Sequence, residues 1–313
     1  MFKNLKFKRL LKYLFLLIII IVLIISLSSY RKPKAFSFDS FNNITGVPYK
    51  IIPNTVHYVL FGSTSLNFIS FLSIISVIKV QQSNVWIHCD CTELSGHYWN
   101  LVESLSNLLQ VPVKVSFIRR PTHVYGQPLS SVYHSSDIAR IQVLMENGGV
   151  YLDTDMVLLK PLDQYLHYEM VVGWPLDEYF GNQIMIGHPK ARFLKKYLES
   201  YKRYLPREWY YNGGQMPTEQ ILMKEPHLVH RVPVLFGVHN LIDKLYGANP
   251  WNAWRQYFAI HLLSRHHVDT ERLNETTILQ YDKPFGEVAR WILYQLKPVL
   301  NTSKGSWDED SSL

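Results

Sequence analysis

The stretch at residues 133–159, YHSSDIARIQVLMENGGVYLDTDMVLL, constrains the fold more than any other part of this chain. Apolar residues recur in it at helical spacing, and either Ser135 or Ser136 is a good N-cap for that helix. Asn147-Gly148-Gly149 then ends the helix, because Gly and Asn tolerate the left-handed conformation of a C-terminal cap. The stretch therefore predicts a helix followed directly by a strand.

The predicted strand begins at Val150 and ends at two aspartates, Asp153 and Asp155. Residues two apart in an extended chain point the same way, so both carboxylates are expected on one side. Two hard oxygen ligands at the end of a buried strand suit a divalent cation that also binds phosphate oxygens. Asp137 and Arg140 lie three apart in the predicted first turn of the helix, also on one face.

Strands and helices alternate along the chain, which predicts an α/β fold with a mostly parallel sheet covered on both faces. Such sheets bind ligands beyond the carboxyl ends of their strands, where Asp153 and Asp155 fall. Residues 210–214 are predicted to form a loop. The predicted strands are 56–61, 85–88, 113–118, 170–174, 183–187 and 228–233, and the predicted helices are 66–80, 98–109, 191–204, 217–224 and 284–296.

The net charge of +7 comes from the N-terminus and does not indicate nucleic-acid binding. Eight basic residues precede the first acid, Asp39, and without them 24 basic residues face 25 acids. The rest of the chain is therefore close to neutral, and no nucleic-acid partner is expected.

Residues 13–30 contain no charged side chain and are long enough to span a membrane. Five basic residues precede this segment and three follow it, which favours a cytosolic N-terminus. A cleaved signal peptide is the alternative. The predicted organisation is a cytosolic tail (1–12), a transmembrane anchor (13–30), a stem (31–50), one catalytic domain (51–300) and a disordered tail (301–313).

Three N-x-S/T triplets, at Asn43, Asn274 and Asn301, are consistent with a luminal domain. We therefore expect a single-pass type II protein of the Golgi or ER membrane. Cys89 and Cys91 are separated by one residue. Free thiols, a strained pair and an intermolecular bond are all open for these two cysteines.

The run SDIAR…ENGGVYLDTD resembles the DxD-containing sugar-transferase family, which includes yeast mannosyltransferases, Golgi galactosyl- and N-acetylglucosaminyltransferases and clostridial glucosylating toxins. The resemblance implies a GT-A fold, a nucleotide-sugar donor, a Mn²⁺ or Mg²⁺ ion and retention of anomeric configuration. It also implies that Asp153 and Asp155 hold metal and diphosphate, and that Asp137 and Arg140 are catalytic residues that contact the donor.

Further candidate residues lie in the second half of the chain. A metal held by two carboxylates and two phosphates usually needs one more protein ligand, for which His261 is preferred over His266 and His267. Asn182 and Gln183 are candidate contacts for the donor sugar. Aromatic clusters at 210–211 and at Trp251 and Trp254 are expected to fill a core, and stacking on sugar rings is the alternative.

These observations predict a membrane-anchored luminal glycosyltransferase that moves a sugar from a nucleotide sugar, preferably a UDP-sugar, to a glycan or glycolipid. The alternatives are a catalytically inactive carbohydrate-binding protein and a glycoside hydrolase. A hydrolase needs an acid and a base that flank the scissile bond from separate positions. Two aspartates on one face of one strand suit a metal better.

Overall fold

The computed structural model describes residues 37–294, of which residues 41–294 belong to one compact unit. The predicted cytosolic tail, membrane anchor and C-terminal tail lie outside the described residues. Within residues 37–294, no helix is both long enough and apolar enough to cross a membrane.

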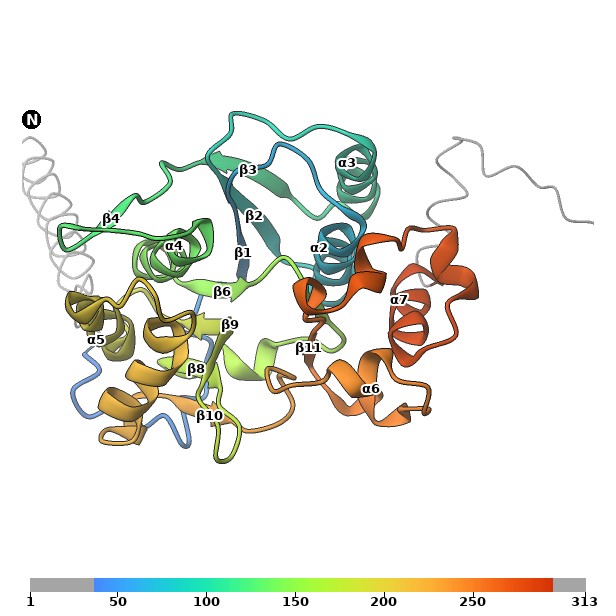
Figure 1. Cartoon of the computed structure of the whole chain (residues 1–313). Helices are drawn as coiled ribbons and strands as arrows, with labels where there is room; N and C mark the ends of the chain where they lie inside the picture. The colour runs from blue at the N-terminus through green and yellow to red at the C-terminus, as the bar shows by residue number, and fades with distance from the viewer. Residues whose placement is uncertain (1–36, 295–313) are drawn as a thin grey trace, which may run out of the picture. The chain divides into compact units, whose positions relative to one another are not determined.

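A seven-stranded sheet runs through the compact unit in the order β10-β8-β9-β6-β1-β2-β3 (Figure 1). Two small antiparallel ladders accompany it, β4 with β5 and β7 with β11. The strands are β1 (Thr55–Leu60), β2 (Asn84–Cys89), β3 (Val113–Phe117), β4 (His123–Val124), β5 (Gln127–Pro128), β6 (Gly149–Leu152), β7 (Met156–Leu158), β8 (Met170–Gly173), β9 (Gly181–Gly187), β10 (His230–Val232) and β11 (Ala259–His261).

The large sheet is mixed but mostly parallel. β1 is parallel to both β2 and β6, β2 is parallel to β3, and β10 is parallel to β8. β9 alone runs antiparallel to its neighbours β6 and β8. Only residues 174–180 join β8 to β9, which is too short for the helical crossover that a parallel pair requires.

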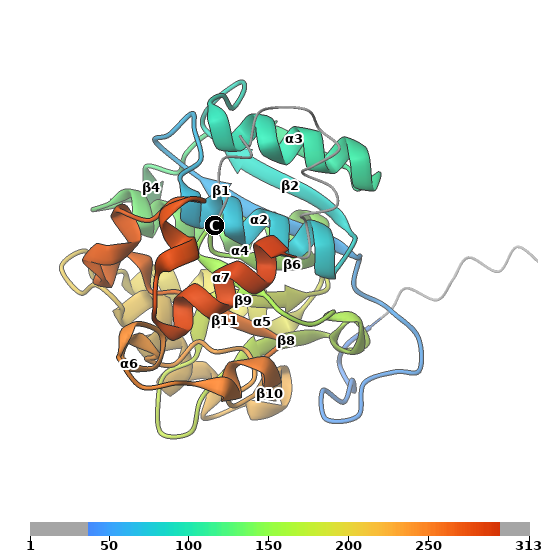
Figure 2. The ribbon, with the colours of Figure 1, turned by 90° about the vertical axis from the view of Figure 1, so that its right-hand side faces the viewer.

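Helices cover both faces of the sheet, as expected for an α/β fold. α2 (Phe68–Val80), α3 (His97–Leu109) and α7 (Pro284–Tyr294) pack on one face, and α4 (Val132–Asn147) and α5 (Arg192–Ser200) pack on the other (Figure 1). A shorter helix, α6 (Ile242–Tyr246), lies near α7 (Figure 2). α2 is buried on nearly all sides, since eleven of its thirteen residues are buried.

The predicted C-terminal end of α4 is confirmed, but its predicted start is wrong. Gly148 and Gly149 have φ values of 64° and 106°, so the chain leaves the helix through a conformation that favours glycine. The N-cap is Ser131, whose hydroxyl accepts a hydrogen bond from the backbone N–H of His134. Ser135 and Ser136 are therefore inside the helix, and Asp137 lies beyond its first turn.

Residues 210–224 also depart from the predicted loop and helix. Tyr211–Gln215 and Thr218–Leu222 form wide, π-helical turns instead. The side chain of Asn212 is buried, accepts from the Leu205 N–H and donates to the Arg203 carbonyl. These contacts fix a segment that Gly213 and Gly214 would otherwise leave loose.

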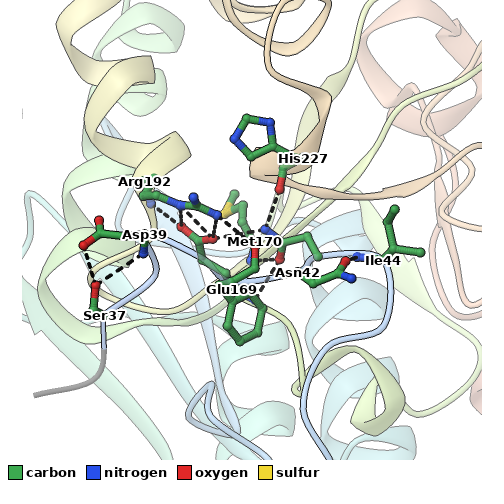
Figure 3. A network of polar contacts seen from close by, with 10 residues as sticks. Ser37, Asp39, Asn42, Ile44, Glu169, Met170, Arg192 and His227 are labelled. Carbon is green, nitrogen blue, oxygen red and sulfur yellow. Dashed lines mark hydrogen bonds and ion pairs between the residues drawn. The ribbon is translucent and has the colours of Figure 1, made fainter. Parts of the chain in front are cut away.

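A buried polar network holds residues from the predicted stem against the sheet (Figure 3). Glu169 is fully buried, and its carboxylate accepts hydrogen bonds from the Arg192 guanidinium and from the Asn43 amide. The Asn43 side chain also donates to the His227 carbonyl and accepts from the Glu169 N–H. The structure also joins Cys89 and Cys91 in a disulfide, which resolves the alternatives for these cysteines.

Candidate active site

A cavity of about 580 Å³ opens at the carboxyl ends of the central strands. Its walls include the end of β1 and the segment after it, the Asp153–Asp155 turn after β6, and Asn182 and Gln183 on β9. Because β9, β6 and β1 are neighbours in the sheet, these three groups lie in that order along its edge. The cavity is large enough for a ligand of nucleotide-sugar size.

The two aspartates point into the same cavity, but the alternation of side chains along a strand is not the cause. β6 ends at Leu152, and the Met156 N–H donates to the Asp153 carbonyl at 2.9 Å, which closes a turn. Asp153 and Asp155 therefore project from a turn, and extended-chain alternation does not position them. The two side chains are 23% and 15% exposed respectively, and both line the cavity.

Asp155 is held by residues from the last third of the chain. His261 Nε2 lies 3.2 Å from Asp155 Oδ1, and Ser264 donates to Asp155 Oδ2 through both its N–H and its hydroxyl. His261 reaches this position from β11, which pairs with β7 directly after the turn. The residue preferred in the sequence as the third metal ligand therefore lies beside Asp155, on a strand.

The protonation of this pair follows from the contacts. Burial raises the pKa of Asp155, but His261 and Ser264 outweigh it and hold that pKa well below its ordinary value. Burial lowers the pKa of His261, but the Asp155 carboxylate outweighs it and raises the pKa above 6.5. Asp155 and His261 therefore stabilise each other as carboxylate and imidazolium.

Asp153, Asp155 and His261 fit a divalent cation. Each offers one ligand atom, and these three atoms lie within 4.8 Å of one another. Two carboxylate oxygens and one imidazole nitrogen make a donor set suited to Mn²⁺ or Mg²⁺. His266 also lines the cavity, whereas His267 stacks on Tyr246 with ring centroids 4.1 Å apart.

Arg140 joins the two predicted pairs of polar residues. Its guanidinium contacts Asp137 Oδ1 at 3.3 Å and Asp153 Oδ1 at 3.1 Å, and it donates to the Asn182 carbonyl at 2.9 Å. It also lies over the Tyr151 ring, 4.7 Å from the centroid. An intrahelical ion pair therefore joins residues 137 and 140, and the same guanidinium extends it to Asp153.

Asp137 faces the β9 side of the cavity. Its carboxylate accepts a hydrogen bond from the Asn182 amide at 2.9 Å. Burial raises the pKa of Asp137, the Arg140 charge opposes this, and the nearby Asp153 carboxylate adds to it, with a net rise. The adjacent Gln183 carries a buried amide oxygen that has no hydrogen-bond partner among residues 37–294. Such an oxygen is suited to accept from a ligand hydroxyl.

Sequence reasoning missed several residues that support these groups. The Tyr151 hydroxyl donates to Asp153 at 2.6 Å, and the Tyr197 hydroxyl lies 3.2 Å from the Asn182 amide. Tyr151 lies on β6 two residues before Asp153, so its position next to the aspartate turn offered a signal for it. Ser264 and Tyr197 carry no such signal, because only the tertiary fold brings them to the site.

The aromatic clusters divide between core and cavity. Trp251 and Trp254 are buried in the core, as expected. Tyr210 lines the cavity, and its hydroxyl donates to the Phe180 carbonyl. Trp209, which the sequence did not single out, also lines the cavity and remains 49% exposed.

Comparison with known families identifies the central segment. Residues 81–172 match the family model described as "Glycosyltransferase sugar-binding region containing DXD motif". The matched segment contains Asp137, Arg140, Asp153 and Asp155. The resemblance predicted from these residues is therefore confirmed over this segment, and the predicted enzyme class, glycosyltransferase, agrees with the description of the family model.

Individual relatives are distant. The chain is 28% identical over 122 residues to glucan organizing enzyme 1 of Cryptococcus neoformans var. grubii, covering 36% of this chain and 31% of that protein. A crystal structure of galactosyltransferase LgtC with donor and acceptor sugar analogs gives a TM-score of 0.42 at 13% identity, over 77% of this chain and 95% of that one. PaToxG glycosyltransferase gives 0.38 at 19% identity, over 57% and 72%. At scores below 0.5, these structural similarities establish neither fold nor activity.

Proposed function

We propose that this protein transfers a sugar from a UDP-sugar to a glycan or glycolipid acceptor. The premise is that the chain carries a DXD-containing glycosyltransferase region. A GT-A fold, dependence on Mn²⁺ or Mg²⁺ and retention of anomeric configuration are parts of this proposal. The observation that carries it is the convergence of Asp153, Asp155 and His261 in one cavity. Asp137 and Arg140 adjoin that cluster.

The order of the strands along the sheet edge supports one orientation of the donor. The nucleoside is placed beside the end of β1, where Ser63, Ser65 and Asn67 line the cavity. The diphosphate is placed at the central turn after β6, and the sugar at Asn182 and Gln183 on β9. Open α/β sheets bind nucleotides beyond the carboxyl ends of their strands, which places the donor along this edge. The sugar is assigned to the β9 end because Asp137, Asn182 and the buried amide oxygen of Gln183 offer polar contacts there.

In this orientation the polar residues have distinct roles. A divalent ion bound by Asp153, Asp155 and His261 would stabilise the negative charge that develops on the leaving diphosphate. Asp137, fixed by Arg140 and Asn182, offers carboxylate oxygens to the hydroxyls of the donor sugar. Arg140 keeps Asp137 and Asp153 at a fixed separation, which preorganises the site before the donor binds.

The proposed location is the Golgi or ER membrane, with residues 13–30 as a type II anchor. The structure distinguishes two of the three N-x-S/T sites. Asn43 is 1% exposed and its amide is used in the Glu169 network, whereas the amide nitrogen of Asn274 makes no hydrogen bond to any residue between 37 and 294. A luminal domain is therefore expected to carry a glycan at Asn274 and none at Asn43. We expect Asn274→Gln to lose a mass that a glycosidase removes from the wild-type protein, and Asn43→Gln to keep it. A wild-type protein without any glycan would contradict the luminal location.

The proposed activity is tested with the full-length protein in detergent. Melting temperatures with UDP-, GDP- and CMP-sugars, each with and without Mn²⁺, identify the donor, because a bound ligand stabilises the folded state by mass action. Sugar transfer is then compared between wild type and Asp153→Asn. We expect a loss of about 100-fold or more, since changes beside a metal ligand alone cost about 10- to 100-fold.

Asp282→Asn is the matched control, because Asp282 is exposed and lies outside the cavity. It should transfer sugar at the wild-type rate. An Asp153→Asn protein that retains full metal-dependent transfer would refute the assignment. A folded wild-type protein that neither binds nor hydrolyses any nucleotide sugar would favour the inactive carbohydrate-binding alternative.

A further inference from the structure

Two aromatic rings and one guanidinium form a cluster at the rim of the cavity. They belong to Tyr133, Trp209 and Arg265. The two rings meet edge to face with centroids 5.1 Å apart. The Arg265 guanidinium lies 3.9 Å from the Tyr133 ring centroid and 4.9 Å from that of Trp209. Arg265 has no carboxylate partner among residues 37–294, so its N–H groups are available to a ligand.

The cluster exposes a large apolar surface that folding alone does not explain. Tyr133 and Trp209 are 43% and 49% exposed, although both line the cavity. Exposed Trp and Tyr rings at the mouth of a polar cavity are typical of ligand contacts, because they combine an apolar face with a polar edge.

The segment that carries Trp209 is fixed in place. His134 Nε2 lies 3.3 Å from the Trp209 carbonyl oxygen, and His134 Nδ1 contacts the Tyr204 hydroxyl. The Tyr204 hydroxyl also accepts from the Ser130 N–H. Trp209 is thus held against the first turn of α4, and the exposed indole is presented by a preorganised support.

The cluster lies at the sugar end of the proposed donor site. Tyr133 precedes Asp137 by four residues on α4, which is about 6 Å along the helix axis. Tyr210, next to Trp209, bonds to the Phe180 carbonyl just before β9. The cluster is therefore on the β9 side of the cavity, away from the end of β1 where the nucleoside is placed.

We infer that Tyr133, Trp209 and Arg265 form the acceptor subsite, in which a saccharide ring stacks on the Trp209 indole and Arg265 donates hydrogen bonds to its oxygens. This inference rests on the proposed function, since the acceptor must lie beside the donor sugar. Arg265 also acts on the rings, because its stacked guanidinium keeps Tyr133 and Trp209 together. The acceptor is thereby identified as a carbohydrate rather than a protein hydroxyl.

The test measures saccharide binding and donor turnover separately on the full-length protein. An array of neutral and acidic oligosaccharides is probed with wild type, Trp209→Ala and the conservative Trp209→Phe. Hydrolysis of the UDP-sugar in water reports the donor site without an acceptor. Tyr125→Ala is the matched control, because Tyr125 is 48% exposed with Lys202 over its ring and lies outside the cavity.

We expect Trp209→Ala to weaken binding of the recognised saccharide about tenfold, the size that one aromatic contact contributes. Trp209→Phe should retain most of the binding, and Tyr125→Ala all of it. The donor KM and the hydrolysis rate are measured for each variant, so that a loss of saccharide binding is separated from damage to the donor site, and both should keep their wild-type values in Tyr125→Ala.

Two results would overturn the subsite. One is a wild-type protein that hydrolyses donor but binds no saccharide, and the other is a Trp209→Ala protein that binds saccharide normally. A wild-type protein that binds saccharide through Trp209 but never turns over a nucleotide sugar would refute the proposed function and leave the saccharide site standing.

Discussion

The histidine pair on β1 and β2 makes the stability of this protein depend on pH. His57 and His88 are 0% and 3% exposed, and His57 Nδ1 lies 2.9 Å from His88 Nε2. Burial and the neighbouring His88 lower the pKa of His57 from 6.5 to about 3. Burial and Lys114 lower the pKa of His88 from 6.5 to about 4. Both rings are therefore neutral in the folded protein at pH 5.

The sign of the effect follows from proton uptake. Below pH 6.5 the unfolded chain binds a proton at each histidine and the folded protein does not, so the free energy of unfolding falls as the pH falls. At pH 5, which is 1.5 units below the unfolded pKa, each ring costs about 2 kcal/mol, or about 4 kcal/mol for the pair. Well above pH 6.5 the histidines are neutral in both the folded and the unfolded chain, so the free energy of unfolding is not reduced by them there.

Urea unfolding at pH 8 and at pH 5 gives the loss of unfolding free energy between the two pH values, and this loss is compared between wild type and variants. The double variant His57→Asn/His88→Asn should lose about 4 kcal/mol less than wild type between the two pH values. The exposed His123→Asn variant should lose as much as wild type. Equal losses in the double variant and wild type would refute the argument, whatever the absolute stability of each protein.

Two further predictions concern buried polar and backbone contacts. Glu169→Ala leaves Arg192 without its buried carboxylate and should lower the free energy of unfolding by about 3–5 kcal/mol. Glu225→Ala, which removes a partly exposed partner of Lys196, should cost under about 1 kcal/mol, and equal costs would contradict the role of burial. Gly149→Ala should cost more than about 2 kcal/mol, because its φ is 106° and the new Cβ would lie 2.5 Å from the Thr55 carbonyl oxygen. Gly126→Ala should cost only about 1 kcal/mol, because Gly126 has a φ of 82° but its new Cβ would have nothing within 4 Å. Urea unfolding of both variants therefore separates the cost of backbone strain alone from the cost of strain together with a steric clash.

Local patterns were enough to predict the core of the fold. β1, α2, β2, α3 and β3 lie within two residues of their predicted limits, because apolar periodicity and buried runs identify such elements. The Gly148-Gly149 stop was predictable from backbone conformation alone. The alternation of elements also predicted a mostly parallel sheet.

Tertiary contacts decided the rest. The direction of β9 depends on a short hairpin, and the start of α4 depends on Ser131, one of several serines able to cap it. The aspartates were placed at the right end of the strand, but their convergence depends on a turn. Ser264 and Trp209 reach the site from distant segments, so no local signal indicated them.

The contact between Asp155 and the segment around β11 has a consequence for chain connectivity. Asp155 and Ser264 are 109 residues apart in sequence, and His261 belongs to the same segment. A cation held by Asp155 and His261 would act as a reversible cross-link that closes this long loop, and closing a long loop removes much conformational entropy from the open chain. The closed loop includes β9 and Trp209. The ion pair and the two Ser264 hydrogen bonds already close it, so a bound cation would add to a closure that the chain makes by itself.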